Sequence, residues 1–253
     1  MDRKNLEEQI TDAMAPQQIT KQEMLENTRN ALDDNYYCDF ILSIGPHCRP
    51  AINLRINHLR EFSSPLDWMM SYSLNTVIHL FKDNFNDFFS TYEVDIENPK
   101  GATGMLRVND TNNHIVSIHH FPESMGVNSS YPQFREKMNA RAKRLTTCLQ
   151  NASYIVLISD RTDSNEDMIT FLRSFSEIYP NLKIRLINMR HDEKMPYDTY
   201  RQELIFHNDL LSYIEYTLND TEQGVRIAAG NTFVWSKILS KYYTPGFQSS
   251  KNE

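Results

Sequence analysis

The segment Ser43-Ile44-Gly45-Pro46-His47-Cys48-Arg49-Pro50 decides the fold class of this chain. Residues 38–44 are apolar and rich in strand formers, and they end at a Gly-Pro turn, so we expect a buried strand there. Residues 49–60 carry Pro50 near their start and apolar residues at helical spacing, which predicts a helix with proline in its first turn. The chain therefore passes from a strand through a tight turn into a helix, with Cys48 at the junction.

Farther along the chain, predicted strands alternate with predicted helices. We expect strands over residues 105–108, 114–119, 153–159 and 183–189, and helices over residues 73–89, 132–150, 165–179, 209–218 and 232–242. Such alternation is typical of βαβ units. It predicts an α/β fold with a mainly parallel sheet and helices on both faces, in a Rossmann-like or hydrolase-like three-layer arrangement.

The domain organisation follows from the absence of a linker. We expect residues 35–243 to form a single α/β domain, because no Pro-, Gly- or Ser-rich stretch divides them. Residues 1–34 are polar with sparse apolar positions, which predicts a helical N-terminal extension. Residues 244–253 are expected to be a flexible tail.

Composition narrows the class of protein. The net charge is -7, which argues against a nucleic-acid partner, because phosphate binding needs clustered Lys and Arg. No apolar run is long enough for a membrane span, and no secretion signal is visible, so we expect a cytoplasmic protein without a membrane partner. The three cysteines include no Cys-x-x-Cys pair, which fits a reducing compartment. The sequence does not identify a partner or an oligomeric state.

Cys48 is the strongest candidate for chemistry. Unpaired N–H groups and a partial positive charge at a helix N-terminus favour a thiolate, and they could also hold an oxyanion during acyl transfer. The alternative interpretation is that Cys48 is a small buried apolar residue at the start of a helix.

Three other segments contain candidate site residues. Asp67, beside Trp68, is either a helix N-cap or a buried carboxylate that orients a His or an Arg, and Trp68 is core or a pocket wall. His119 and His120 end a predicted strand, and strand alternation sends them to opposite faces, so one at most is a general base. Arg161 follows another strand and could bind an anion, or form an ion pair with Asp160 or Asp163.

A zinc site is the main metal alternative. Cys48, His47, His119 and His120 are suitable residue types, but the His-x-x-x-His and Cys-x-x-Cys spacings are missing. We therefore expect neither a metal nor another cofactor.

As an ordered set these motifs resemble a bacterial and viral family of unknown function that is named for papain-like cysteine peptidases. The resemblance covers residues 37–190 and rests on Ile44-Gly45-Pro46-His47-Cys48, Pro65-Leu66-Asp67-Trp68, His119-His120-Phe121, the basic helix over residues 137–144, and residues 154–161. The sequence departs from the family pattern at Ile44, Leu66 and His120. The resemblance implies that Cys48 is the nucleophile, His119 the base and Asp67 the group that orients it. Our own prediction places Arg161, His120 and Trp68 at the substrate.

The predicted architecture is in tension with that family name. In papain-like folds no central strand leads into the nucleophile's helix, whereas here a strand does, as in the nucleophile elbow of α/β hydrolases. We therefore expect a cysteine-dependent hydrolase or acyl transferase, not necessarily a peptidase. The alternatives are a non-catalytic domain that binds an anionic small molecule, such as a sugar phosphate or nucleotide, and an interaction protein that uses residues 1–34.

Overall fold

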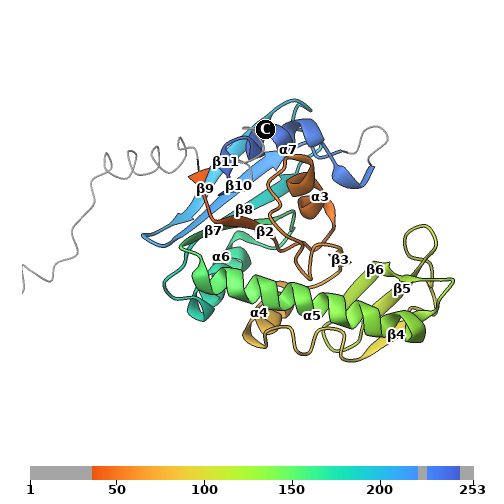
Figure 1. The fold of residues 1–253 in the computed structure, drawn as a ribbon. Coiled ribbons are helices and arrows are strands. Elements are labelled where there is room, and N and C mark those ends of the chain that lie inside the picture. Colours follow the sequence, from red (N-terminus) through yellow and green to blue (C-terminus); the bar gives the residue numbers. More distant parts are fainter. Residues whose placement is uncertain (1–35, 222–226, 246–253) are drawn as a thin grey trace, which may run out of the picture. The chain divides into compact units, whose positions relative to one another are not determined.

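The computed structural model describes residues 36–221 and 227–245 (Figure 1). The predicted N-terminal extension, residues 1–34, lies outside these ranges, and so do residues 246–253 of the predicted tail. Within them the protein is a mixed α/β structure, as the sequence predicted at this level. No helix in the described ranges has both the length and the apolar character needed to cross a bilayer.

The larger sheet has five strands in the order β2-β7-β8-β10-β9. The first four strands are parallel, and β9 is antiparallel to its neighbour β10. The parallel register aligns Leu42 of β2 with Leu157 of β7, and Leu157 with Leu186 of β8. The four parallel strands are largely buried on both faces, as expected for a parallel sheet covered by helices. The bounds of the five strands are β2 (Phe40–Ser43), β7 (Tyr154–Ser159), β8 (Lys183–His191), β9 (Tyr200–His207) and β10 (Leu211–Leu218).

A second sheet of four antiparallel strands corrects the prediction of one mainly parallel sheet. Its order is β3-β6-β5-β4, with β3 (Met69–Met70), β4 (Tyr92–Val94), β5 (Met105–Asp110) and β6 (Ile115–Pro122). The sequence did predict β5 and β6, but not their pairing as a hairpin, which local patterns leave open. A parallel pair of two-residue strands, β1 (Tyr36–Tyr37) and β11 (Tyr242–Tyr243), completes the described strands.

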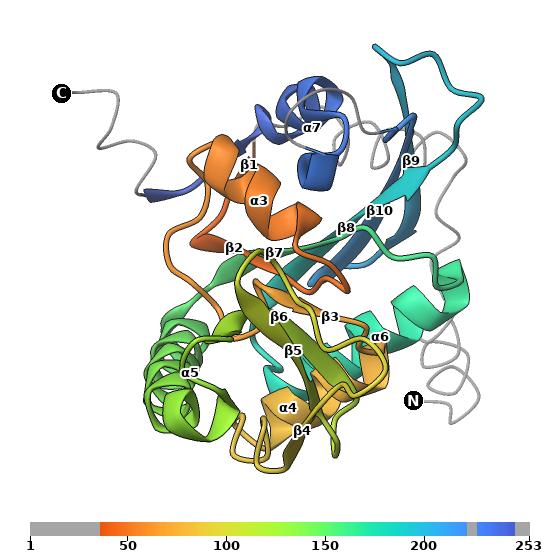
Figure 2. The same ribbon diagram turned by 90° about the vertical axis from the view of Figure 1, so that its right-hand side faces the viewer.

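Helices lie on both faces of the five-stranded sheet (Figures 1 and 2). On one face are α4 (Leu74–Lys82), α5 (Val127–Asn151) and α6 (Asn165–Ile178), whose apolar residues share one core with Leu42, Leu157 and Leu186. On the other are α3 (Arg49–Ile56), the short helix η1 (Ile227–Ala229) and α7 (Thr232–Leu239). Cys48, the nucleophile candidate, lies at the N-terminus of α3, a few residues after the carboxyl end of β2.

One predicted element was of the wrong type, and another was predicted too long. Residues 209–218 were predicted as a helix, but residues 211–218 form the fully buried strand β10. Because β10 is buried on both faces, apolar and polar residues do not alternate along it, and the alternation that identifies a strand is missing. The apolar positions fit a helical period equally well. The helix predicted over residues 73–89 ends at Lys82, because Asn84 and Phe85 adopt positive φ angles of 52° and 61°, which a helix does not allow.

Candidate active site

Cys48 lies at the junction that the sequence predicted. β2 ends at Ser43, the chain turns at Gly45 with a φ of 48°, and Cys48 is the N-cap of α3. Gly45 is required here, since a Cβ atom at this position would overlap the hydroxyl group of Tyr72. The turn thus presents the sulfur of Cys48 at the carboxyl end of the parallel strands, where open α/β sheets place their ligands.

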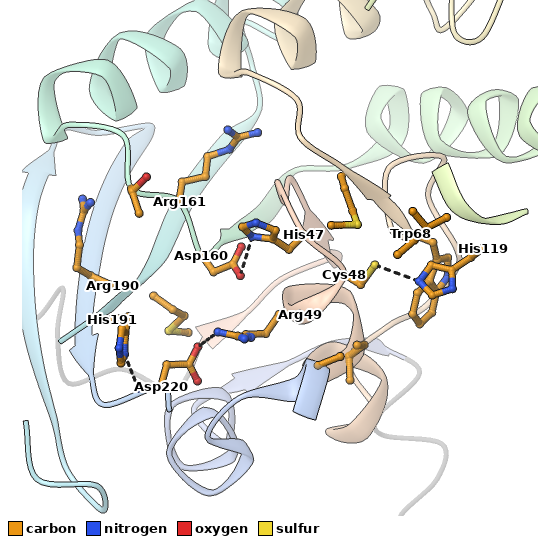
Figure 3. Close-up of a pocket in the computed structure, with 16 residues that line it drawn as sticks. His47, Cys48, Arg49, Trp68, His119, Asp160, Arg161, Arg190, His191 and Asp220 are labelled. Carbon is orange, nitrogen blue, oxygen red and sulfur yellow. Dashed lines mark hydrogen bonds and ion pairs between the residues drawn. The ribbon is translucent and has the colours of Figure 1, made fainter. Parts of the chain in front are cut away.

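His119 reaches Cys48 from the other sheet. The distance from Cys48 Sγ to His119 Nε2 is 3.6 Å, and the two side chains face each other across one end of a cavity (Figure 3). Trp68 lies beside the imidazole, with the two ring centroids 5.8 Å apart in an edge-on arrangement. β6 supplies His119, and its partner β3 begins at Met69, directly after Trp68, so the antiparallel sheet brings both rings to the thiol.

The protonation states of Cys48 and His119 correct the expectation that the helix N-terminus favours a thiolate at Cys48. Burial, followed by the charges of Asp160 and Asp67, raises the pKa of the Cys48 thiol to about 11, so the helix N-terminus does not produce a thiolate. Burial also lowers the pKa of His119 below its ordinary value. At neutral pH the resting site therefore contains a thiol beside a neutral imidazole, which is the pairing that general-base catalysis requires.

Asp67 is buried, and its carboxylate interacts with Ser64 and Arg60. Its Oδ2 accepts a hydrogen bond from the backbone N–H of Ser64 at 3.1 Å and lies 3.5 Å from Arg60 Nη1. Burial raises the pKa of this carboxyl to about 6, against the opposing effects of Ser64 and Arg60. In the described part of the chain Asp67 caps no helix and makes no hydrogen bond to His119, so its predicted role as orienter can only be indirect.

His120 points away from the cavity, as strand alternation predicts. Its Nδ1 lies 2.9 Å from Ser117 Oγ, and its ring packs against Phe134 of α5 with centroids 5.4 Å apart. Burial and the nearby charges of Arg141 and Lys137 lower the pKa of His120 to about 3. The residue is absent from the cavity wall, so the structure offers no contact for its predicted role at the substrate.

The cavity has a volume of about 560 Å³ and extends from Cys48 and His119 toward the ends of β8 and β10. Trp68 and Arg161, two of the residues predicted at the substrate, are among those that line it. Arg161, however, is 3% exposed and donates hydrogen bonds to the carbonyl oxygens of Ile44 and Tyr72, so much of its guanidinium is used within the fold.

Sequence reasoning did not assign several cavity residues to the site. These are His47, Arg49, Ile52, Met70, Ile118, Asp160, Thr162, Met189, Arg190, His191, Asp220 and Ala228. Arg190 and His191 end β8, and Asp220 follows β10, so the rule that sites gather at carboxyl ends of parallel strands could have found them. Interpreting residues 209–218 as a helix concealed the strand that leads to Asp220.

The site shows no sign of a metal centre. Within residues 36–221 and 227–245, no group of three or more His, Cys, Asp or Glu side chains is arranged to hold a metal ion. The arrangement can instead support proton transfer between a thiol and an imidazole at the mouth of a cavity.

Fold and site together define a mixed α/β protein with a paired cysteine and histidine. Residues 39–209 match the family described as "Putative papain-like cysteine peptidase", and this chain belongs to that family. It is also 23% identical, over 140 residues, to "Uncharacterized protein R408" of Acanthamoeba polyphaga mimivirus; the match spans 49% of this chain and 63% of that protein, under two thirds of its length. This relative is viral, so it gives no support to a bacterial source. No solved structure matches the chain.

Proposed function

We propose that this protein is a cysteine-dependent hydrolase or acyl transferase, with Cys48 as nucleophile and His119 as general base. The observation that carries the proposal is the 3.6 Å separation of Cys48 Sγ and His119 Nε2 at the end of a cavity. Membership of a family described by peptidase chemistry supports the same reaction class.

The reaction would begin with a neutral pair. As Cys48 Sγ attacks the acyl carbon, His119 Nε2 takes the thiol proton and then gives it to the leaving group, which leaves a thioester on Cys48. A water molecule or an acceptor nucleophile then gives its proton to His119 and attacks the thioester. This releases the acyl product and returns the proton to the sulfur. Backbone N–H groups at the start of α3 are the candidates to stabilise the oxyanion.

Asp67 would act on His119 through a chain of contacts. It faces Arg60, whose guanidinium lies 5.7 Å from the ring centroid of Trp68, and Trp68 in turn contacts His119. We assign Asp67 and Arg60 as positioning residues that hold the Trp68 ring, and Trp68 as the wall that fixes the imidazole plane.

The alternative of an anion-binding domain has less support, because Arg161 donates to backbone carbonyls and faces Asp163.

The architecture also favours hydrolase-like chemistry over a papain-like arrangement. In our proposal the parallel strands of the larger sheet form the hydrolase-like layer, since β2 leads into the Cys48 turn as the nucleophile strand of α/β hydrolases does.

The test is to trap the thioester. The protein is mixed with acyl thioesters and p-nitrophenyl esters of increasing length, quenched in acid, and mapped by mass spectrometry. We expect an acyl group on Cys48 and faster release of the leaving group than from free thiol. Cys48→Ala should abolish both, and Cys148→Ala, which changes a half-buried thiol on α5, should change neither. Equal release by Cys48→Ala and the unaltered protein would refute the proposal.

A further inference from the structure

The cationic side chains of the cavity are each matched by a carboxylate. The three arginines that line the cavity all have an acidic partner within ion-pair distance. Figure 3 shows one of these pairs, Arg49 with Asp220. The pairs are Arg49 with Asp220 at 2.9 Å, Arg190 with Glu215 at 2.6 Å, and Arg161 with Asp163 at 3.5 Å. These positive charges are thus balanced within the fold and leave little net attraction for an anionic ligand.

Asp160 is the carboxylate of the cavity wall that faces no arginine or lysine at ion-pair distance in the described ranges. Its side chain is 7% exposed, and its Oδ2 lies 3.4 Å from Nδ1 of His47, a residue whose side chain is 54% exposed. Its Oδ1 is buried and has no hydrogen-bond donor among the described residues. A carboxylate held in a cavity wall without a cationic side chain beside it is costly, which is a reason to look for a ligand that brings a positive charge to this part of the cavity.

We infer that Asp160 determines the charge of the substrate, and that the acyl substrate carries an ammonium or guanidinium group near the carbonyl that Cys48 attacks. This inference rests on the proposed function. Ile52, Met70 and Met189 line the same cavity and would pack against the apolar stem that carries the cation.

The charge of Asp160 also acts on the nucleophile. Burial is the largest cause of the raised pKa of the Cys48 thiol, and the charge of Asp160 is the second largest. A cation bound at Asp160 would offset this charge and make the thiol easier to deprotonate, so the correct substrate would assist its own reaction. An anionic substrate would add to the repulsion instead.

Charge-matched thiol reagents test this inference without requiring catalysis. Cys48 is modified with methanethiosulfonates bearing a trimethylammonium, a sulfonate or a neutral methyl group, and site-specific rates are measured by mass spectrometry. Each rate is divided by the rate of N-acetylcysteine amide. We expect the cationic reagent to exceed the anionic one by about tenfold or more at low salt, and the ratio to fall as salt is added.

Asp160→Asn removes the charge with little change of shape, and its ratio should fall to near one. The matched control is Glu166→Gln, which removes an exposed charge in the first turn of α6, away from the cavity. A ratio near one in the unaltered protein would overturn the inference. A ratio in Asp160→Asn equal to that of the unaltered protein would also overturn it.

The two proposals fail separately. The neutral reagent and the thioester trap report whether Cys48 is a nucleophile, while the ratio of charged reagents reports the potential at its sulfur. If Asp160→Asn does not fold, as judged by circular dichroism, the salt dependence of the ratio in the unaltered protein still decides the question, because a constant ratio would contradict a nearby uncompensated charge.

Discussion

Arg161 holds the carbonyl oxygen of Ile44 with two donors, since its Nε and Nη2 each lie 3.2 Å from that atom. Nη2 also donates to the carbonyl oxygen of Tyr72 at 2.9 Å. The loop after β7 is thereby joined to the backbone that leads from β2 toward Cys48. Arg161 thus links the two neighbouring parallel strands whose carboxyl ends form the site.

Arg161→Ala should therefore destabilise the fold. The change leaves two buried carbonyl oxygens without donors, and we expect a loss of about 3 kcal/mol in the free energy of unfolding, measured by urea denaturation. Arg201→Ala is the control, because that side chain is 58% exposed and 3.8 Å from Glu203, and it should cost less than about 0.5 kcal/mol. Unchanged stability in Arg161→Ala would instead favour its predicted role in substrate binding.

His119 and His120 form a matched pair for testing the general base. His119→Ala should slow thioester formation on Cys48 by about 10²–10⁴-fold without a large change in stability, because the half-buried ring makes few other contacts. His120→Ala removes a side chain packed on Phe134 and should lower stability but leave the rate within a few-fold. The two variants are compared by single-turnover kinetics and thermal unfolding. The reverse pattern would identify His120 as the base.

The pH dependence of Cys48 alkylation reports its protonation. Because burial, Asp160 and Asp67 raise the pKa of the thiol to about 11, the rate with iodoacetamide should keep rising beyond pH 9 instead of levelling off near pH 6. Mass-spectrometric rates between pH 6 and about pH 10 measure this, with N-acetylcysteine amide as the ordinary thiol. A plateau below pH 7 would show that a thiolate–imidazolium pair exists at rest.

The sequence predicted the junction at Cys48 because its signals are local: an apolar run, a Gly-Pro turn and a proline in the first helical turn. It also placed His119 and His120 on opposite faces, since strand alternation is a local rule. It could not predict that Asp67 would pair with Arg60 and not with His119, because that choice depends on how two sheets pack. Asp220 was missed for a different reason, because residues 209–218 were interpreted as a helix and not as the strand that leads to it. Asp160 was considered only as an ion-pair partner of Arg161.

Asp67 should make the free energy of unfolding depend on pH. Its pKa of about 6 lies above the ordinary value of 3.8, so the folded protein binds this proton more tightly than the unfolded chain does. The stability that protonation contributes is complete below pH 3.8 and is lost as the pH rises to about 6. We expect Asp67→Asn to remove up to about 3 kcal/mol of this decline, measured by urea denaturation at several pH values. Asp198→Asn, at an exposed position, should keep the original slope.

Gly45 offers the most direct test of the turn that presents Cys48. Gly45 and Gly104 both have positive φ angles, 48° and 73°, but a Cβ atom on Gly45 would overlap Tyr72, whereas one on Gly104 would meet nothing within 4 Å. Gly104→Ala should therefore cost about 1 kcal/mol for the backbone conformation alone, as measured by thermal unfolding.

Gly45→Ala carries the same backbone cost and must also displace the buried Tyr72 ring, which lies under the Arg161 guanidinium at 5.3 Å. We expect it to lower stability by several kcal/mol more than Gly104→Ala and to slow thioester formation on Cys48, because the loop that carries the sulfur must move. Equal losses in the two variants would mean that Tyr72 does not support the turn. The turn would then be held by its hydrogen bonds, from Arg161 to the carbonyl oxygen of Ile44 and from the N–H of Ser71 to the carbonyl oxygen of Pro46.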